Sequence, residues 1–207
     1  MGRDQVNRSG EGFSRREFLK GSGAAVVAGA AGTSAVEGPL KAQQRATQII
    51  SAGPHAITLN VNGEDKQVTV EPRVLLIDAL RNDLNLTGCK DVCDRSTCGA
   101  CTVLIDGKPV YACTRFAIEV VGQKIVTAES LHSPEKTDDV VNAFCKHDAI
   151  QCGFCTPGFV MAVRGFCDQN PGASEETCRR ALGGNICRCG IYDGVLKAAY
   201  DTAQIAQ

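Results

Sequence analysis

The sequence of 207 residues contains no tryptophan, and aromatic residues make up only 5% of it. Proteins that stack nucleic-acid bases need aromatic side chains, so this scarcity argues against a stacking platform. The formal net charge is −1, so the chain also lacks the basic field that would attract a phosphate backbone. We therefore expect no nucleic-acid partner.

A long hydrophobic run is also missing near the N-terminus. The apolar stretch GSGAAVVAGAAG at residues 21–32 consists mainly of alanine and glycine, whereas a membrane-spanning helix needs about 20 strongly apolar residues. We therefore expect no transmembrane anchor. The preceding segment SRREFLK (residues 14–20) fits the twin-arginine export pattern. Residues 1–42 are thus predicted to be a twin-arginine signal peptide and linker, cleaved within 36–46, and the protein is predicted to be periplasmic.

Histidine is rare, whereas cysteine is abundant. The three histidines, His55, His132 and His147, are isolated in the sequence, which excludes the paired Cys/His motifs of a Rieske centre. The 12 cysteines could form disulfides after export. Because the twin-arginine route carries folded proteins, typically around a cofactor, a prosthetic group is the favoured interpretation.

The sequence pattern predicts two domains of class α+β. Residues 55–70 alternate between apolar and polar side chains around Asn62-Gly63, which predicts a β-hairpin. A helix is expected over 74–84, a second hairpin over 102–111, and one or two short strands within 118–127. The first domain is predicted to span 53–130, with a helix packed on a mixed sheet.

Helical patterns dominate beyond Ser133-Pro134, which is interpreted as the joint between the domains. The second domain is predicted to span 131–207. Its four expected helices cover residues 137–147, 157–169, 175–182 and 194–205.

Four cysteines of the first domain form what we call the first cysteine set: Cys93, Cys98, Cys101 and Cys113. Their C-x4-C-x2-C…C spacing is that of plant-type 2Fe–2S ferredoxins. Gly99 and Ala100 allow the loop to wrap closely, so that backbone N–H groups face the sulfur atoms. Zinc and a disulfide framework remain alternatives, although three cysteines on one loop fit the usual zinc knuckles poorly.

Four cysteines of the second domain form the second cysteine set: Cys152, Cys155, Cys187 and Cys189. They occur as a C-x2-C pair and a C-x-C pair, each expected at the start of a helix. Helix N-termini present free N–H groups that suit an anionic cluster. This pattern alone is only moderately specific.

Three segments in order, TCGACTVLIDG (97–107), QCGFCTPG (151–158) and GNICRCGIY (184–192), resemble the small iron–sulfur subunit of the molybdenum hydroxylases, the xanthine dehydrogenase and aldehyde oxidase family. The chain is most similar to the small subunits of periplasmic aldehyde oxidoreductases and isoquinoline 1-oxidoreductase-like enzymes. The resemblance implies a β-grasp, plant-type ferredoxin-like domain followed by a small four-helix-bundle 2Fe–2S domain.

The resemblance also implies the cofactors and the site residues. Cys93, Cys98, Cys101 and Cys113 would bind the distal 2Fe–2S cluster, and Cys152, Cys155, Cys187 and Cys189 the proximal one. Gln151 and Cys189 match positions that touch the pterin of a molybdenum cofactor held by a separate large subunit. Electrons would pass from molybdenum through the proximal and then the distal cluster to a flavin (FAD) subunit or a cytochrome, and this chain would hold no catalytic residue.

Two other functions are kept as alternatives. The chain could be a free-standing periplasmic 2Fe–2S electron carrier, although a shuttle would need only the first cluster. It could also be a non-redox binding module held together by zinc or disulfides.

Several positions depart from the family pattern. Val92 and Ser96 stand where glycine is usual, and a glycine there often indicates a positive φ. Valine tolerates a positive φ badly, so the distal loop is expected to be reshaped. Cys89 could compete with Cys93 as a ligand, but only Cys93 gives the x4 spacing. Three further cysteines match no ligand position and are interpreted as buried small residues, with a Cys167–Cys178 disulfide as the alternative: Cys145, Cys167 and Cys178.

Overall fold

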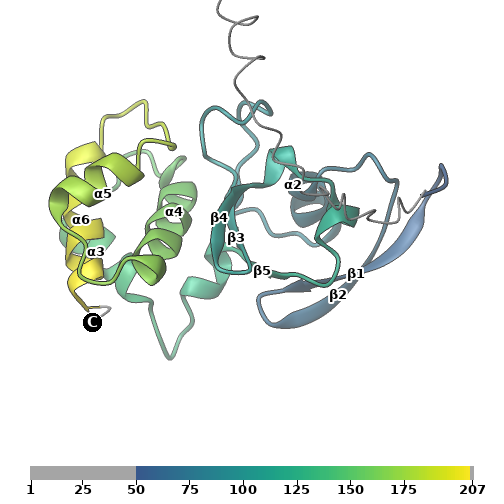
Figure 1. The fold of residues 1–207 in the computed structure, drawn as a ribbon, viewed down its shortest axis with the longest axis horizontal. Helices are drawn as coiled ribbons and strands as arrows, with labels where there is room; N and C mark the ends of the chain where they lie inside the picture. Colours follow the sequence, from purple (N-terminus) through teal and green to yellow (C-terminus); the bar gives the residue numbers. More distant parts are fainter. Residues whose placement is uncertain (1–49, 206–207) are drawn as a thin grey trace, which may run out of the picture. The chain divides into compact units, whose positions relative to one another are not determined.

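A computed structural model describes residues 50–205, which belong to one compact unit. The predicted signal segment, 1–42, and its predicted cleavage region, 36–46, lie outside the described residues. The class is α+β, as expected: a mixed sheet comes first and a group of helices follows (Figure 1).

Five strands form one sheet in the order β2-β1-β5-β3-β4. β1 pairs antiparallel with β2 and parallel with β5, and β3 pairs antiparallel with β4 and β5. Asn62 (φ 56°) and Gly63 (φ 84°) both have positive φ at the first hairpin turn, the conformation that the Asn-Gly pair predicts. The bounds are His55–Val61 for β1, Glu64–Val70 for β2, Thr102–Ile105 for β3, Lys108–Tyr111 for β4 and Lys124–Val126 for β5.

The helix predicted after Pro72 is shorter and less regular than expected. α2 (Leu76–Asp78) continues as a π-helical turn, Ala79–Asp83, which ends when the N–H of Leu84 donates to the carbonyl of Ala79. Leu76, Ile77 and Leu80 pack against the inward-facing residues of β1, β2, β3 and β5 in one core. Within 118–127 only β5 forms. Three 3-10 turns complete this half: Ala112–Thr114, Ala117–Val120 and Ala128–Leu131.

Four helices follow and share a second core. The Asp138 side chain caps α3 by accepting from the N–H of Val140, and Ser174 caps α5 by accepting from the N–H of Thr177. The helices are α3 (Asp139–Lys146), α4 (Thr156–Gln169), α5 (Glu175–Ala181) and α6 (Tyr192–Ile205). No helix in the described part of the chain is long and apolar enough to cross a membrane.

α4 packs against β3 and β4, so both faces of β3 are covered (Figure 1). Val103 and Ile105 belong to the core of the sheet, whereas Leu104 points into the core of the helices. Gly165 makes this close approach possible, because a Cβ there would lie 2.6 Å from a methyl carbon of Leu104. The fully buried strand β3, with the sequence TVLI, therefore contributes side chains to both hydrophobic cores.

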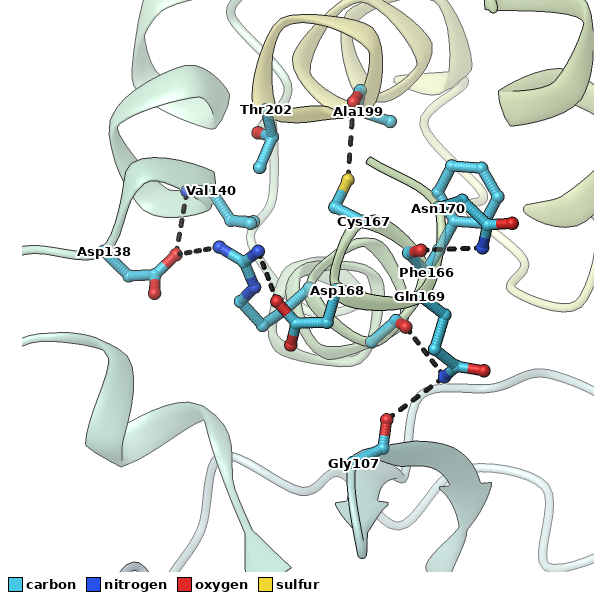
Figure 2. Close-up of polar contacts among 12 residues, drawn as sticks. Gly107, Asp138, Val140, Phe166, Cys167, Asp168, Gln169, Asn170, Ala199 and Thr202 are labelled. Atoms are coloured by element: carbon cyan, nitrogen blue, oxygen red, sulfur yellow. Dashed lines mark hydrogen bonds and ion pairs between the residues drawn. The ribbon is translucent and has the colours of Figure 1, made fainter. Parts of the chain in front are cut away.

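Polar side chains tie α4 to its surroundings (Figure 2). The guanidinium of Arg164 donates to Asp138 at 3.3 Å and to Asp168 at 2.5 Å. The side-chain amide of Gln169 donates to the carbonyl of Gly107, in the turn between β3 and β4, at 3.2 Å. These contacts connect α4 to the start of α3 and to the sheet.

Candidate iron–sulfur centres

The first cysteine set comes together at one end of the sheet. Cys93, Cys98 and Cys101 lie on the loop before β3, and Cys113 lies in the 3-10 turn after β4. The thiols form two close pairs, since the side chain of Cys93 hydrogen-bonds with Cys98 and that of Cys101 with Cys113. Cys101 and Cys113 are buried, whereas Cys93 and Cys98 are partly exposed.

The loop that holds these thiols wraps through residues with positive φ. Asp94 (φ 49°), Ser96 (φ 59°) and Gly99 (φ 70°) adopt the left-handed conformation. Ser96 therefore occupies a position that favours glycine, as the sequence suggested. Val92 is not among the positive-φ residues, so the expected strain there was wrong, and valine fits the loop as it stands.

Hydrogen bonds and burial give the thiols of this region different acidities. The hydroxyl of Thr97, with backbone N–H groups of Arg95 and Thr97, lowers the pKa of Cys93 to about 6. Burial raises the pKa of Cys101 to about 12 and that of Cys89 further still. The thiol of Cys89 instead points at the carbonyl of Cys101, 3.4 Å away. The thiolate-stabilising environment thus lies at Cys93 and not at Cys89.

The second cysteine set lies where two helices begin. Cys155 is the N-cap of α4, and the Cys187–Cys189 pair immediately precedes α6, so both pairs lie at helix starts, as predicted. The thiols again form two close pairs, Cys155 with Cys187 and Cys152 with Cys189. Each thiol pair therefore joins one cysteine of the C-x2-C motif to one of the C-x-C motif.

Opposing effects set the pKa values of the second set. Burial raises the pKa of Cys155 to about 12. Burial also acts to raise the pKa of Cys187, but hydrogen bonds from the Ile191 N–H, the Cys155 thiol and nearby backbone N–H groups outweigh it, so the pKa is lowered. The Tyr192 hydroxyl accepts from the N–H of Cys187 at 2.8 Å and donates to its carbonyl at 3.2 Å. The Tyr192 side chain therefore satisfies both backbone polar groups of Cys187.

The arrangement of the thiols fits a 2Fe–2S cluster in each set. Such a cluster has two irons and takes four thiolates, which matches four thiols arranged as two pairs. Backbone N–H groups beside Cys93 and Cys187 suit the negative charge of a bound cluster.

The two sets differ in their surface. Cys152, Cys189 and Gln151 of the second region are exposed. Large apolar side chains next to these residues in the sequence are exposed as well: Phe154 is 55% exposed, Ile186 54% and Ile150 51%. We call Ile150, Phe154, Ile186 and Tyr192 the apolar rim.

Comparison with known proteins agrees with these sites. The 2Fe-2S iron-sulfur cluster binding domain family matches residues 59–125, the 2Fe-2S binding domain family matches residues 127–200, and the twin-arginine translocation signal matches residues 12–32. The chain is 42% identical over 146 residues to the beta subunit of the 6-hydroxypseudooxynicotine dehydrogenase complex of Paenarthrobacter nicotinovorans, covering 70% of this chain and 91% of that one. It is 37% identical over 208 residues to the aldehyde oxidoreductase iron-sulfur-binding subunit PaoA of Escherichia coli K12, covering 92% and 88%.

The chain belongs to the small iron–sulfur subunits of the molybdenum hydroxylases. A solved chain of quinoline 2-oxidoreductase from Pseudomonas putida 86 has the same fold, with a TM-score of 0.71 and 39% identity over 74% of this chain and 96% of that one. As a member of this family, the chain is a non-catalytic electron-transfer subunit of an oxidoreductase with two 2Fe–2S-binding domains. The twin-arginine match confirms the export signal predicted in the sequence.

Some contributing residues were not found from the sequence. Thr97, Tyr192 and Asn185 contact the cysteine loops. All three lie within the TCGACTVLIDG and GNICRCGIY segments, but the sequence pattern assigned none of them a role. The remaining cysteines form no disulfide in the structure. Cys167 and Cys178 are fully buried. The thiol of Cys167 points at the carbonyl of Ala199, 3.5 Å away (Figure 2). Cys145 is exposed, contrary to expectation.

Proposed function

We propose that this chain carries electrons out of a molybdenum hydroxylase through two 2Fe–2S clusters, the proximal one on the second cysteine set and the distal one on the first. The paired thiols in each set support this ligand assignment. When bound, the clusters supply one-electron chemistry, and electrons would reach the proximal cluster before the distal one. The β-grasp and four-helix-bundle descriptions, with a boundary at residue 130, are part of the same proposal.

The apolar rim supports docking of a large molybdenum-cofactor subunit at the second set. Large apolar side chains gathered around exposed thiols are typical of a surface that is covered in a complex. Gln151 and Cys189 are exposed on the same loops, and we infer that they contact the pterin of the cofactor. Relatives named as subunits of a dehydrogenase complex and of an aldehyde oxidoreductase support a heteromeric assembly.

Electrons would leave at the first cysteine set. Cys93 is partly exposed there, and its neighbour Val92 is 52% exposed, so a second partner can approach closely. We propose an FAD subunit or a cytochrome as this acceptor. The substrate, an aldehyde or an N-heterocycle, would be bound by the large subunit. The export signal supports a periplasmic location.

Co-purification tests the assembly against the alternative of a free-standing carrier. With an affinity tag after residue 207 in the native host, the chain should retain a larger polypeptide and molybdenum. Phe154→Glu places a charge in the apolar rim and should release both. Val121→Glu is the matched control, because Val121 is similarly exposed (46%) but lies in the other half of the protein. A chain that purifies alone with its clusters would instead be a free-standing carrier.

A further inference from the structure

One short segment joins the two cysteine sets. The main-chain N–H of Ile186 donates a hydrogen bond of 2.9 Å to the carbonyl oxygen of Cys98. Ile186 directly precedes Cys187 of the second set, and Cys98 belongs to the first set. This hydrogen bond therefore connects Cys98, a candidate ligand of one cluster, to the residue next to Cys187, a candidate ligand of the other.

The side chain of Asn185 holds this segment in place. It is buried, with 6% exposure, and its amide donates to the Gly99 carbonyl at 2.8 Å and to the Thr102 hydroxyl at 3.3 Å. The Thr102 hydroxyl in turn donates to the same Gly99 carbonyl at 2.6 Å. The amide thus reaches the turn between Cys98 and Cys101 from the segment that leads to Cys187.

Gly99 is the matching feature on the other side of this contact. A Cβ at Gly99 would lie 2.6 Å from the amide carbon of Asn185 and 2.8 Å from the carbonyl oxygen of Gly184, and its φ of +70° also favours glycine. The first cysteine loop therefore lacks a side chain where the Asn185 amide packs. Because the amide is buried against two acceptors, its hydrogen bonds fix one orientation of the segment.

We infer that Asn185 is a positioning residue that sets the coupling between the two cluster sites by holding the Ile186–Cys187 backbone on the Cys98 turn. The inference rests on the proposed function, since it requires a cluster on each cysteine set. It goes beyond that function by assigning a role in their mutual placement to a buried side chain that ligates neither cluster. The Tyr111 hydroxyl holds the same segment from β4 by donating to the Gly184 carbonyl at 2.7 Å. Without the amide, the Ile186–Cys98 hydrogen bond is no longer accompanied by the hydrogen bonds of Asn185 to Gly99 and Thr102.

Two substitutions test this role in the protein purified with its partners. Asn185→Leu and Asn185→Asp keep roughly the size of the side chain and remove the amide donor. After full reduction each 2Fe–2S cluster carries an unpaired spin, and two neighbouring spins split each other's low-temperature EPR signals. Both variants should keep the iron content of the unsubstituted protein and lose or markedly reduce this splitting, since it depends steeply on separation and on the bonded path.

Matched controls separate this effect from a general loosening. Gln169→Leu removes another hydrogen bond between the helices and the sheet, the one to Gly107, at the far end of α4 (Figure 2). Thr102→Ser keeps the hydroxyl that Asn185 contacts. Both control variants should retain the full splitting.

The outcomes distinguish failure of the proposed function from failure of the Asn185 inference alone. Unsubstituted protein without two clusters would overturn the proposed function and this inference with it. Two clusters that do not split each other's signals, or splitting that persists in both Asn185 variants, would overturn the inference alone. Loss of iron from both variants would also overturn it, because Asn185 would then be needed to form a site and not to position one.

Discussion

The N-terminal turn of α4 lies directly against the loop of the first cysteine set: a Cβ on Gly158 would be 2.4 Å from the carbonyl oxygen of Gly99. It would also lie 3.0 Å from the Cα of Ala100. Both neighbours are backbone atoms between Cys98 and Cys101, so they cannot turn away as a flexible side chain would. The start of the helix that follows Cys155 is therefore packed against the other cysteine loop.

Gly158→Ala should displace this contact and destabilise the protein. Overpacking of a tight interior typically costs about 1–3 kcal/mol, and in a domain of this size each 1 kcal/mol lowers the thermal midpoint by about 2–4 °C. We expect a lower midpoint and faster loss of iron on heating. Gly183→Ala is the control, because a Cβ there meets nothing within 4 Å and no positive φ applies. Equal midpoints for the two variants would contradict the packing described.

Cys93→Ser and Cys89→Ser should have different effects on the distal cluster. Cys93 carries the thiolate-stabilising hydrogen bonds, whereas the buried thiol of Cys89 points at a backbone carbonyl. We expect Cys93→Ser to abolish or shift one of two EPR signals and Cys89→Ser to leave both in place. Loss of a signal only in Cys89→Ser would reverse the ligand assignment.

The acidity of Cys93 can be measured once iron has been removed by a chelator. The thiolate is the nucleophile, and an ordinary cysteine has a pKa of about 8.5. Because the pKa of Cys93 is lowered to about 6, its alkylation by iodoacetamide should rise between about pH 5 and 7, a range in which an unperturbed thiol stays mostly protonated. Site-resolved mass spectrometry gives the midpoint. Thr97→Val removes the main hydrogen-bond donor and should move that midpoint upward; an unchanged midpoint would rule out Thr97 as the cause.

Asp138→Ala should weaken the attachment of α3 to α4. The carboxylate caps α3 and pairs with Arg164, whose side chain is only 16% exposed. Loss of the cap alone lowers the free energy of unfolding by about 1 kcal/mol. Because the guanidinium also loses a partner, we expect the free energy of unfolding to fall by about 1–3 kcal/mol in total. Asp138→Asn retains a cap and should cost less. Glu176→Ala removes an exposed i,i+4 pair with Arg180 and should change the stability by less than about 0.5 kcal/mol.

The sequence predicted those elements whose signals are local. The Asn62-Gly63 turn, the second hairpin and the helix start at Cys155 are set by neighbouring residues, and each was found where expected. The cysteine spacing also predicted that Cys93, Cys98 and Cys101 lie together on one loop, whereas the meeting of the two motifs of the second set was implied only by the family resemblance.

What the sequence could not predict depends on contacts between distant segments. The helix expected over 74–84 forms only as the short α2, Leu76–Asp78, followed by the π-helical turn Ala79–Asp83, and no pattern in the sequence predicted that turn. Backbone φ at Val92 depends on how the whole loop wraps, so a family pattern alone gave the wrong expectation. The Asn185–Gly99 and Gly158–Gly99 contacts join residues far apart in the chain, and no local pattern reveals them.

The central claim is that this chain carries two 2Fe–2S clusters, and the iron and acid-labile sulfide content per chain tests it most directly. The protein should be purified from its native host with whatever remains bound. The account predicts about four irons and four sulfides per chain, two of each for every cluster. About two of each would leave one cysteine set without a cluster, and the absence of iron and sulfide would contradict the electron-transfer account altogether.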